Sequence, residues 1–483
     1  MQNKFKKYLP HFISLLIFLI ISVIYFQPLF EGKVIRQGDI INYKGFSKEI
    51  NDYREKYGEE PLWTNSLFGG MPAYQISVKY KGNLIQFIDK ALQLWLPFPA
   101  GLLFLMLLGF FILMLVLDID PWIAFAGALA FAFSSYFFII LEAGHNSKAH
   151  AIAYMAPVLA GIILCFKQKY ILGGALSALF ISLEIATNHL QITYYLLIAV
   201  IIFIVVEGVY AIREKQIKNY LKALGVLSIA SILAVLPNMN NLLVTYDYSK
   251  YTTRGKSELT FDLKNKTSGL DKDYATQWSY GKAETFSLMI PNIKGGASDL
   301  LINNKKAIAT IEPKYRRALY EAQINQYWGD QPFTSGAVYT GAFVVFLFIL
   351  GLFIVKGKYK WFLLIATIIS ILLAWGKNFM WLSDIFLDYF PGYNKFRAVS
   401  MILVIAELSI PILAVITLYE IYKKPTIIKE NKKWFFISLA LTAGLALLFW
   451  LMPTTFFSFF SAKELEEFSK QAGQKGLDEF LNI

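Results

Sequence analysis

One short hinge gathers most of the chain's acid–base chemistry. The segment LEAGHNSKAH lies between two long apolar runs and contains two of the chain's four histidines. His145 and His150 lie there with Glu142, Asn146 and Lys148. A histidine near a carboxylate is typical of proton transfer or metal binding. We therefore predict that this cluster serves chemistry, although polar filler in a hinge is the alternative for any single histidine.

A carboxylate and an aromatic segment follow the first apolar run. Asp39 comes after Gly38, which predicts a tight turn that points the carboxylate toward the membrane; a helix N-cap or an Asx turn is the alternative. The segment PLWTNSLFGGMPAYQ places Trp63 and Tyr74 around a glycine pair at 69–70. Such aromatic residues also form plain interfacial belts. The glycine pair favours a backbone held close to a ligand or a neighbouring helix.

Further candidates occur late in the chain. Asp384 and Asp388 are spaced to share one face of a short interfacial helix. Arg397 lies at the start of an apolar run, and its planar guanidinium suits a phosphate; snorkelling toward the membrane surface is the alternative. Glu284 opens a short apolar run before Pro291. It is most simply a surface carboxylate, but it is also a candidate substrate ligand.

Three carboxylates lie inside apolar runs, at Glu184, Glu207 and Glu407. Such groups are costly in lipid and are candidates for function. Glu184 precedes His189 by five residues, so we expect the two side chains to line one cavity. Glu207 is expected to snorkel, and no specific function follows for Glu407.

The elements that position these residues are membrane-spanning helices. The chain has 483 residues, of which 56% are hydrophobic and 17% charged, and its mean hydropathy is +0.48. These values exclude a soluble globular domain and predict an all-α polytopic membrane protein. Helices of roughly 20 apolar residues cross a bilayer. Eleven runs fit, at 9–30, 100–118, 121–141, 150–166, 170–187, 190–212, 220–243, 335–355, 359–376, 398–422 and 433–453.

The charge pattern of the short loops predicts the orientation. Lys and Arg concentrate in NKFKK, KQK, REKQIKNYLK, KGKYK and KKPTIIKENKK, which places the N-terminus and these loops in the cytoplasm. The net charge of +12 therefore reflects this bias and does not indicate nucleic-acid binding. The predicted organisation is a cytoplasmic N-terminus with the first helix (1–30), a first extracytoplasmic loop (31–99), helices 2–7 (100–243), an extracytoplasmic insert (244–334), helices 8–11 (335–453) and an extracytoplasmic tail (454–483).

Two further features limit the alternatives. No small-residue cleavage site follows the first apolar run, so we expect an uncleaved anchor and not a signal peptide. The single cysteine, Cys165, lies inside a predicted span and allows neither a disulfide framework nor a cysteine-based metal site. In the tail, the stretch SAKELEEFSKQAGQKGLDEFL is expected to form an amphipathic surface helix.

Four motifs, in this order and spacing, resemble the YfhO-type bacterial membrane proteins. They are the Gly-Asp after the first span, PLWTNSLFGGMPAY, EAGHNSKAHAIAYMAPV and YNKFRAVSM. That family is similar to the GT-C class of polytopic glycosyltransferases, which take a sugar from a polyprenyl-phosphate carrier. Family members usually continue with a further outer domain and at least one more span. On this resemblance the chain would be a C-terminally truncated member.

The resemblance implies a function and site residues. It implies sugar transfer to a cell-envelope acceptor, at the outer face of the bacterial cytoplasmic membrane. Asp39 would be the catalytic base and Arg397 would bind the carrier phosphate. The lipid carrier would enter beside the aromatic segment. The other implied substrate-binding residues are His145, Asn146, Lys148, His189, Glu284, Trp63 and Tyr74.

Other functions stay open at this point. His145, Lys148 and His189 could assist the phosphate or, with a carboxylate, hold a divalent cation, but no ligand spacing dictates a metal. A transporter or lipid flippase of envelope precursors would also use intramembrane carboxylates, although no inverted repeat is visible. A non-catalytic scaffold of envelope-polymer assembly is the third possibility.

Overall fold

The protein is mostly helical, with 71% of the described residues in helices. The computed structural model describes the chain apart from residues 1, 256–264, 322, 462–463, 467–468 and 471–483. Contacts divide the chain into two compact units, residues 1–133 with 137–252 and residues 134–136 with 253–483. Each unit is described by itself.

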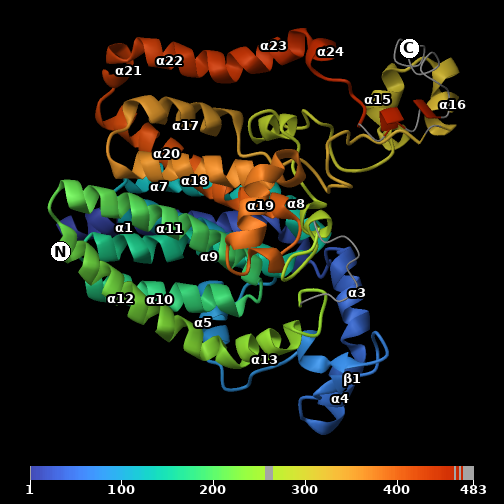
Figure 1. The fold of residues 1–483 in the computed structure, drawn as a ribbon. Helices are drawn as coiled ribbons and strands as arrows, with labels where there is room; N and C mark the ends of the chain where they lie inside the picture. The colour runs from blue at the N-terminus through green and yellow to red at the C-terminus, as the bar shows by residue number, and fades with distance from the viewer. Residues whose placement is uncertain (1, 256–264, 322, 462–463, 467–468, 471–483) are drawn as a thin grey trace. The chain divides into compact units, whose positions relative to one another are not determined.

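The first unit holds a helical bundle and, between α2 and α6, a segment of short elements (Figure 1). Its helices are α1 (Gln2–Tyr25), α2 (Gln27–Phe30), α3 (Gly38–Phe46), α4 (Lys48–Tyr57), η1 (Ala73–Gln75), α5 (Ile85–Leu92), α6 (Ala100–Val116), α7 (Pro121–Ala132), α8 (Ser135–Ala143, from residue 137), α9 (Asn146–Phe166), α10 (Tyr170–Ala186), α11 (Leu190–Arg213), α12 (Ile217–Val235), η2 (Leu236–Asn238) and α13 (Met239–Ser249). Its strands, β1 (Trp63–Thr64) and β2 (Met71–Pro72), form an antiparallel pair with Trp63 opposite Pro72.

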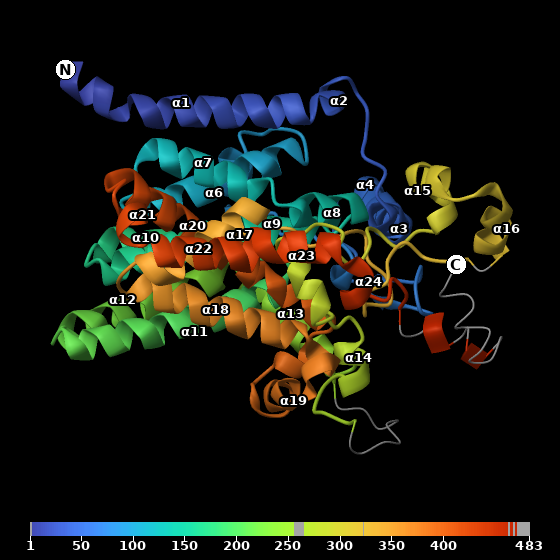
Figure 2. The ribbon, with the colours of Figure 1, turned by 90° about the horizontal axis from the view of Figure 1, so that it is seen from above.

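Helix α9 is the centre of this unit. It is buried along almost its whole length and packs against α6, α10 and α11 (Figures 1 and 2). Small residues let α9 and α10 approach closely. A Cβ atom added to Gly173 of α10 would lie 2.6 Å from the backbone nitrogen of Cys165 in α9. A helix that is apolar all round belongs in such a core.

The second unit packs around α20 (Val404–Lys423), which contacts α17 (Ala342–Ile354) and α18 (Lys358–Ala374). Its other elements are α14 (Lys272–Thr276), η3 (Ala283–Leu288), η4 (Leu301–Asn303), α15 (Lys305–Thr310), α16 (Pro313–Glu321), η5 (Gly376–Phe379), α19 (Met380–Tyr389), η6 (Tyr393–Lys395), η7 (Val399–Leu403), α21 (Ile427–Glu430), α22 (Lys432–Leu439), the π-helical turn η8 (Ala440–Gly444), α23 (Leu445–Leu451) and α24 (Pro453–Phe456).

Glu407 is fully buried in α20 and joins three segments of this unit. Its carboxylate accepts hydrogen bonds from the hydroxyls of Ser134 and Thr340, the latter at 3.0 Å. A buried carboxylate needs such donors because it has lost its water. Glu407 therefore connects helix α20 to the chain that precedes α8 and to the chain that precedes α17.

Several helices are long and apolar enough to cross a membrane, which supports the predicted class. Six described helices pass this test, and eight do if each of two bent helix pairs is one span. Three predicted spans coincide with shorter apolar helices, α6, α10 and α17. The number eleven therefore stays a prediction, as does the orientation. The predicted surface helix of the tail lies largely outside the described residues.

Candidate functional site

The first-loop helix α3 docks onto the turn between α8 and α9 through a pair of amides. Gln37, which precedes α3, donates to the backbone oxygen of Leu141 and to Oδ1 of Asn146, the second at 2.9 Å. Asn146 donates back to Gln37 Oε1 at 3.3 Å. A Cβ atom on Gly144 would lie 3.0 Å from Cβ of Asp39, so glycine is needed for this close approach. Asn146, a predicted substrate ligand, is thus engaged in positioning α3.

This docking places Asp39 beside His145. The Asp39 carboxylate lies 3.3 Å from His145 Nε2, and the two side chains are 57% and 46% exposed. Lys148, in the first turn of α9, is only 6% exposed, and its ammonium interacts electrostatically with Asp39. An accessible carboxylate therefore lies beside an imidazole and interacts with a buried cation.

His189 joins the same group from the turn between α10 and α11. Asn188 before it adopts a left-handed conformation, with φ of 61°, which asparagine tolerates better than most residues. The buried Nδ1 atom of His189 has no hydrogen-bond partner among the described residues. Lys148 and His145 both interact with His189 electrostatically. The structure therefore brings together Asp39, His145, Lys148 and His189, which are distant in sequence.

Both histidines are neutral at pH 7. Partial burial and the Lys148 ammonium lower the pKa of His145 to about 4, against the opposing effect of Asp39. Burial, followed by Lys148, lowers the pKa of His189 to about 4. A neutral imidazole can accept a proton or a hydrogen bond, which a protonated one cannot.

Neither conformation expected at Gly38 and Asp39 is present. Gly38 is the first residue of α3 and has no positive φ, so it does not form the predicted tight turn. The N-cap residue is Gln37, and Asp39 lies in the first helical turn. The capping alternative is therefore wrong as well. The partial positive charge of a helix N-terminus stabilises a carboxylate in this position.

The donor set does not fit a divalent cation. Among the described residues, no three His, Cys, Asp or Glu side chains are grouped so that they could hold a metal ion. The Lys148 ammonium also places a positive charge close to Asp39.

His150 belongs to a second cluster, which the sequence did not predict. Asp89 of α5 accepts hydrogen bonds from His150 at 2.7 Å, Tyr154 at 2.5 Å and Gln93 at 2.9 Å. Burial raises the pKa of Asp89, but these three bonds together lower it below its usual value. The available signal was a lone carboxylate in the amphipathic segment IQFIDKAL. This network attaches α5 to α9.

Trp63 and Tyr74 of the aromatic segment have different surroundings. Gly70 has a φ of 122°, and a Cβ atom there would lie 2.7 Å from Nε1 of Trp63. Gly70 thus accommodates the Trp63 ring of its own hairpin, which is not the ligand or helix that we expected; a Cβ atom on Gly69 would contact nothing among the described residues. Tyr74 instead lines a cavity of about 980 Å³ within the first unit.

Arg397 lies in the second unit, and its assignment to the carrier phosphate stays a prediction. Its Nη1 atom donates to the Tyr274 hydroxyl at 2.6 Å. Its guanidinium lies 5.6 Å and 6.0 Å from the ring centres of Tyr274 and Trp278. Ala398, the next residue, has a left-handed backbone with φ of 56°. Such strain in a residue with a side chain persists only where its surroundings impose it. The aromatic neighbours hold an exposed guanidinium in one place.

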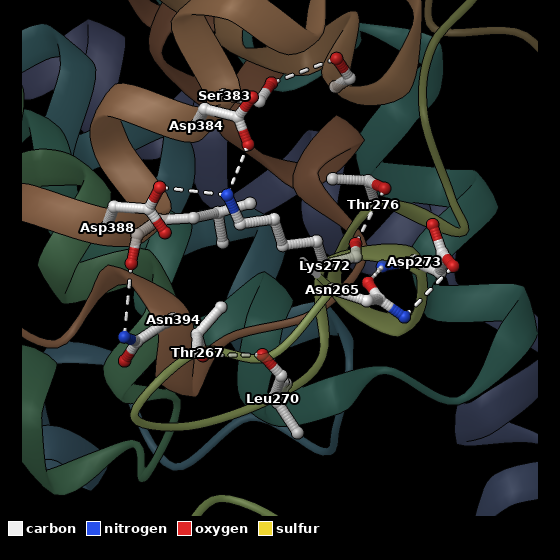
Figure 3. Close-up of polar contacts among 12 residues, drawn as sticks. Asn265, Thr267, Leu270, Lys272, Asp273, Thr276, Ser383, Asp384, Asp388 and Asn394 are labelled. Carbon is white, nitrogen blue, oxygen red and sulfur yellow. Dashed lines mark hydrogen bonds and ion pairs between the residues drawn. The ribbon is translucent and has the colours of Figure 1, made fainter. Parts of the chain in front are cut away.

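Asp384 and Asp388 share one face of α19, which confirms their predicted spacing. Lys272 Nζ donates to both carboxylates, at 2.6 Å and 2.9 Å (Figure 3). Burial opposes the charge of Lys272, but the two carboxylates raise its pKa above the usual value. This ion-pair cluster connects α14 to α19.

Glu284 is 3% exposed, so its interpretation as a surface carboxylate is wrong. It accepts hydrogen bonds from the Gly281 amide and the Tyr327 hydroxyl, both at 2.6 Å. Burial raises its pKa, against the effect of these donors. The bonds organise the loops around η3, and the proposed contact with a substrate stays untested.

Comparison with protein-family models, curated proteins and solved structures finds no match to this chain. The resemblance to YfhO-type proteins therefore stays a prediction.

Proposed function

We propose that this protein is a membrane glycosyltransferase that moves a sugar from a polyprenyl-phosphate carrier to a hydroxyl of a cell-envelope acceptor. The observation that carries the proposal is the Asp39 carboxylate, which is accessible and held 3.3 Å from the neutral His145. A general base has to reach the proton that it removes. The accessibility of Asp39, on a helix docked against the α8–α9 turn, supports this role.

The proposed reaction is a single displacement. Asp39 accepts the proton of the acceptor hydroxyl while the oxygen forms a bond to the anomeric carbon. The bond from that carbon to the phosphate oxygen breaks, and the carrier phosphate leaves with the electron pair. The transition state resembles an oxocarbenium ion, and displacement from the opposite side inverts the anomeric configuration.

Two cationic residues have functions in this proposal. Lys148 interacts electrostatically with Asp39 and supplies a buried positive charge near the proposed base. Arg397 is the proposed phosphate ligand, because a planar guanidinium can bind two phosphate oxygens at once. Its contacts with Tyr274 and Trp278 support a fixed orientation.

The proposal includes the finer architecture that the sequence suggested. We propose eleven membrane-spanning helices in a GT-C-like arrangement, a cytoplasmic N-terminus and an active face outside the cytoplasmic membrane. The short apolar helices α6, α10 and α17 would then bring the eight longer candidates, with each bent pair counted as one span, to eleven.

Right-side-out vesicles that contain the full chain test the function. Polyprenyl-phosphate hexose with a radiolabelled sugar is added from outside, and the label is followed from the lipid extract into the envelope polymer. We expect transfer only in vesicles with the protein. Label that stays in the lipid fraction of both vesicle types would reject the proposal.

A transporter of lipid-linked precursors is the second candidate. The fully buried carboxylate of Glu184 favours it, because its Oε1 atom has no hydrogen-bond partner among the described residues. Transport would make a labelled lipid accessible on the other membrane face without changing its chemical form. The same vesicles distinguish this result from sugar transfer.

A further inference from the structure

A cavity of about 980 Å³ lies within the first unit, beneath the loop that connects η1 to α5. Its walls come from residues 74–86, from α3 and from the ends of α10 and η2–α13. This volume is within the range of pockets that bind small ligands. The proposed reaction assigns no ligand to this cavity.

Its lining is rich in carboxamides. They are Gln75, Asn83, Gln86, Asn188, Asn238, Asn240 and Asn241. Each carboxamide offers two donor hydrogens and an acceptor oxygen. A hydroxyl also donates and accepts, so neighbouring hydroxyls on one ligand can pair with several amides. The lining therefore matches a ligand with many hydroxyl groups.

Several of these amides are already oriented by the protein. Asn241 donates to Oδ1 of Asn188 at 3.0 Å, and Asn83 donates to the backbone oxygen of Pro237, also at 3.0 Å. Neither bond uses the full capacity of a carboxamide. Side chains fixed before binding lose less conformational entropy when the ligand arrives.

Aromatic rings complete the lining, and its charges are few. Tyr74 and Tyr80 both line the cavity; burial, together with the nearby Tyr74, raises the pKa of the Tyr80 phenol. Glu60 is paired with Arg54 through two bonds of 2.7 Å. The Lys81 ammonium donates to the backbone oxygen of Gly58 at 3.0 Å. With Lys79, the lining has three charged residues of both signs, which do not select a charged ligand. Its three tyrosine rings, Tyr43 included, suit the apolar C–H faces of a ligand.

Two segments of the chain contribute residues both to the cavity and to the Asp39 cluster. Tyr43 lines it and lies one turn after Asp39 in α3, which places both side chains on the same helix face. Asn188 lines it and directly precedes His189. A ligand in this cavity would therefore extend toward the proposed base.

We propose that this cavity binds an uncharged saccharide segment of the acceptor and directs one hydroxyl of that segment toward Asp39. The identity of the ligand as the acceptor rests on the proposed function. The binding of a saccharide at these residues does not, and it is measured without any transfer.

Saturation-transfer NMR of the full chain in detergent micelles tests the binding. Maltotriose, cellotriose and chitotriose are the neutral probes, and glycerol 3-phosphate is the charged comparison. We expect at least one trisaccharide to receive saturation. Asn240→Ala removes an amide and Tyr80→Phe removes only a hydroxyl, and each should weaken that binding about five- to tenfold. Asn65→Ala and Tyr251→Phe change exposed residues outside the cavity lining and should leave the binding unchanged.

The outcomes separate this inference from the proposed function. Asp39→Asn should bind the same trisaccharide as the unaltered chain, because it changes the base and not the cavity. Saccharide binding without transfer in the vesicles would support the cavity and count against the transferase. Binding of no trisaccharide, equal binding in all the variants, or binding of glycerol 3-phosphate alone would overturn the inference.

Discussion

At the scale of single residues, Asp39 is the most informative position. Asp39→Asn keeps the size and most of the hydrogen bonding of the side chain, but asparagine cannot accept a proton. We expect sugar transfer to fall about 10²–10⁴-fold with donor binding nearly unchanged. Single-turnover transfer in vesicles with equal protein levels measures this. Asp52→Asn is the matched control, since Asp52 is an exposed carboxylate of α4 that pairs with Lys48. Transfer at the normal rate by Asp39→Asn would reject the catalytic assignment.

Arg397 should affect affinity more than turnover. Arg397→Lys keeps the charge but loses the forked geometry, so we expect the KM for the lipid-linked donor to rise about tenfold. Tyr274→Phe keeps the ring beside the guanidinium and removes the 2.6 Å hydrogen bond, so its effect should be smaller and in the same direction. Steady-state kinetics against donor concentration separates KM from kcat. If Arg397 only snorkels, Lys should serve equally well.

At the scale of elements, the Asp89 network should control the attachment of α5. Asp89→Asn removes the charge that receives three hydrogen bonds. Hydrogen bonds to a charged group stabilise more than neutral ones, so we expect a loss of about 2 kcal/mol in the local opening free energy of α5. Amide hydrogen exchange over residues 85–92 measures this opening. Lys90→Gln, which removes an exposed charge from the same helix, should leave the exchange unchanged; equal protection in both variants would contradict the network's function.

The α10–α11 turn should make stability depend on pH. His189 has its folded-state pKa lowered to about 4 from a usual value of 6.5. Above pH 6.5 both folded and unfolded chains carry a neutral imidazole, so its contribution to stability is complete. As the pH falls from 6.5 toward 4, the unfolded chain binds the proton first, and the unfolding equilibrium shifts by up to tenfold per pH unit.

Thermal unfolding between pH 4 and pH 8 measures this effect. His189→Gln cannot titrate in this range, so we expect it to lose less stability on acidification than the unaltered chain. His11→Gln is the control histidine substitution, because His11 lies in α1, far along the chain from this turn. An identical acid response of the His189 variant and the unaltered chain would contradict the assignment.

At the scale of the whole molecule, the orientation in the membrane can be tested by cysteine labelling. The chain has one cysteine, Cys165, and it is buried, so the background should be low. We expect Asn65→Cys to react with a membrane-impermeant maleimide in intact cells. Glu214→Cys, in a predicted cytoplasmic loop, should react only after permeabilisation. The opposite result for the two exposed positions would reverse the proposed orientation.

Local features of this protein could be predicted from the sequence. Apolar runs fall on helices because a backbone in lipid has to satisfy its hydrogen bonds within each segment. The shared face of Asp384 and Asp388 follows from the helical repeat alone, and Lys272 confirms it. Residue types also predicted that Asp39, His145 and His189 belong to one functional site, although they are distant in the chain.

Only the tertiary structure decided which of these groups meet. Gln37 pairs with Asn146, and this pairing places Asp39 at His145. His150, five residues along, turns instead to Asp89. The sequence by itself determined helical membrane segments and the chemistry available at their ends, because both depend on neighbouring residues. Partners between distant segments depend on how helices pack, and packing is set by side-chain shapes along both surfaces at once.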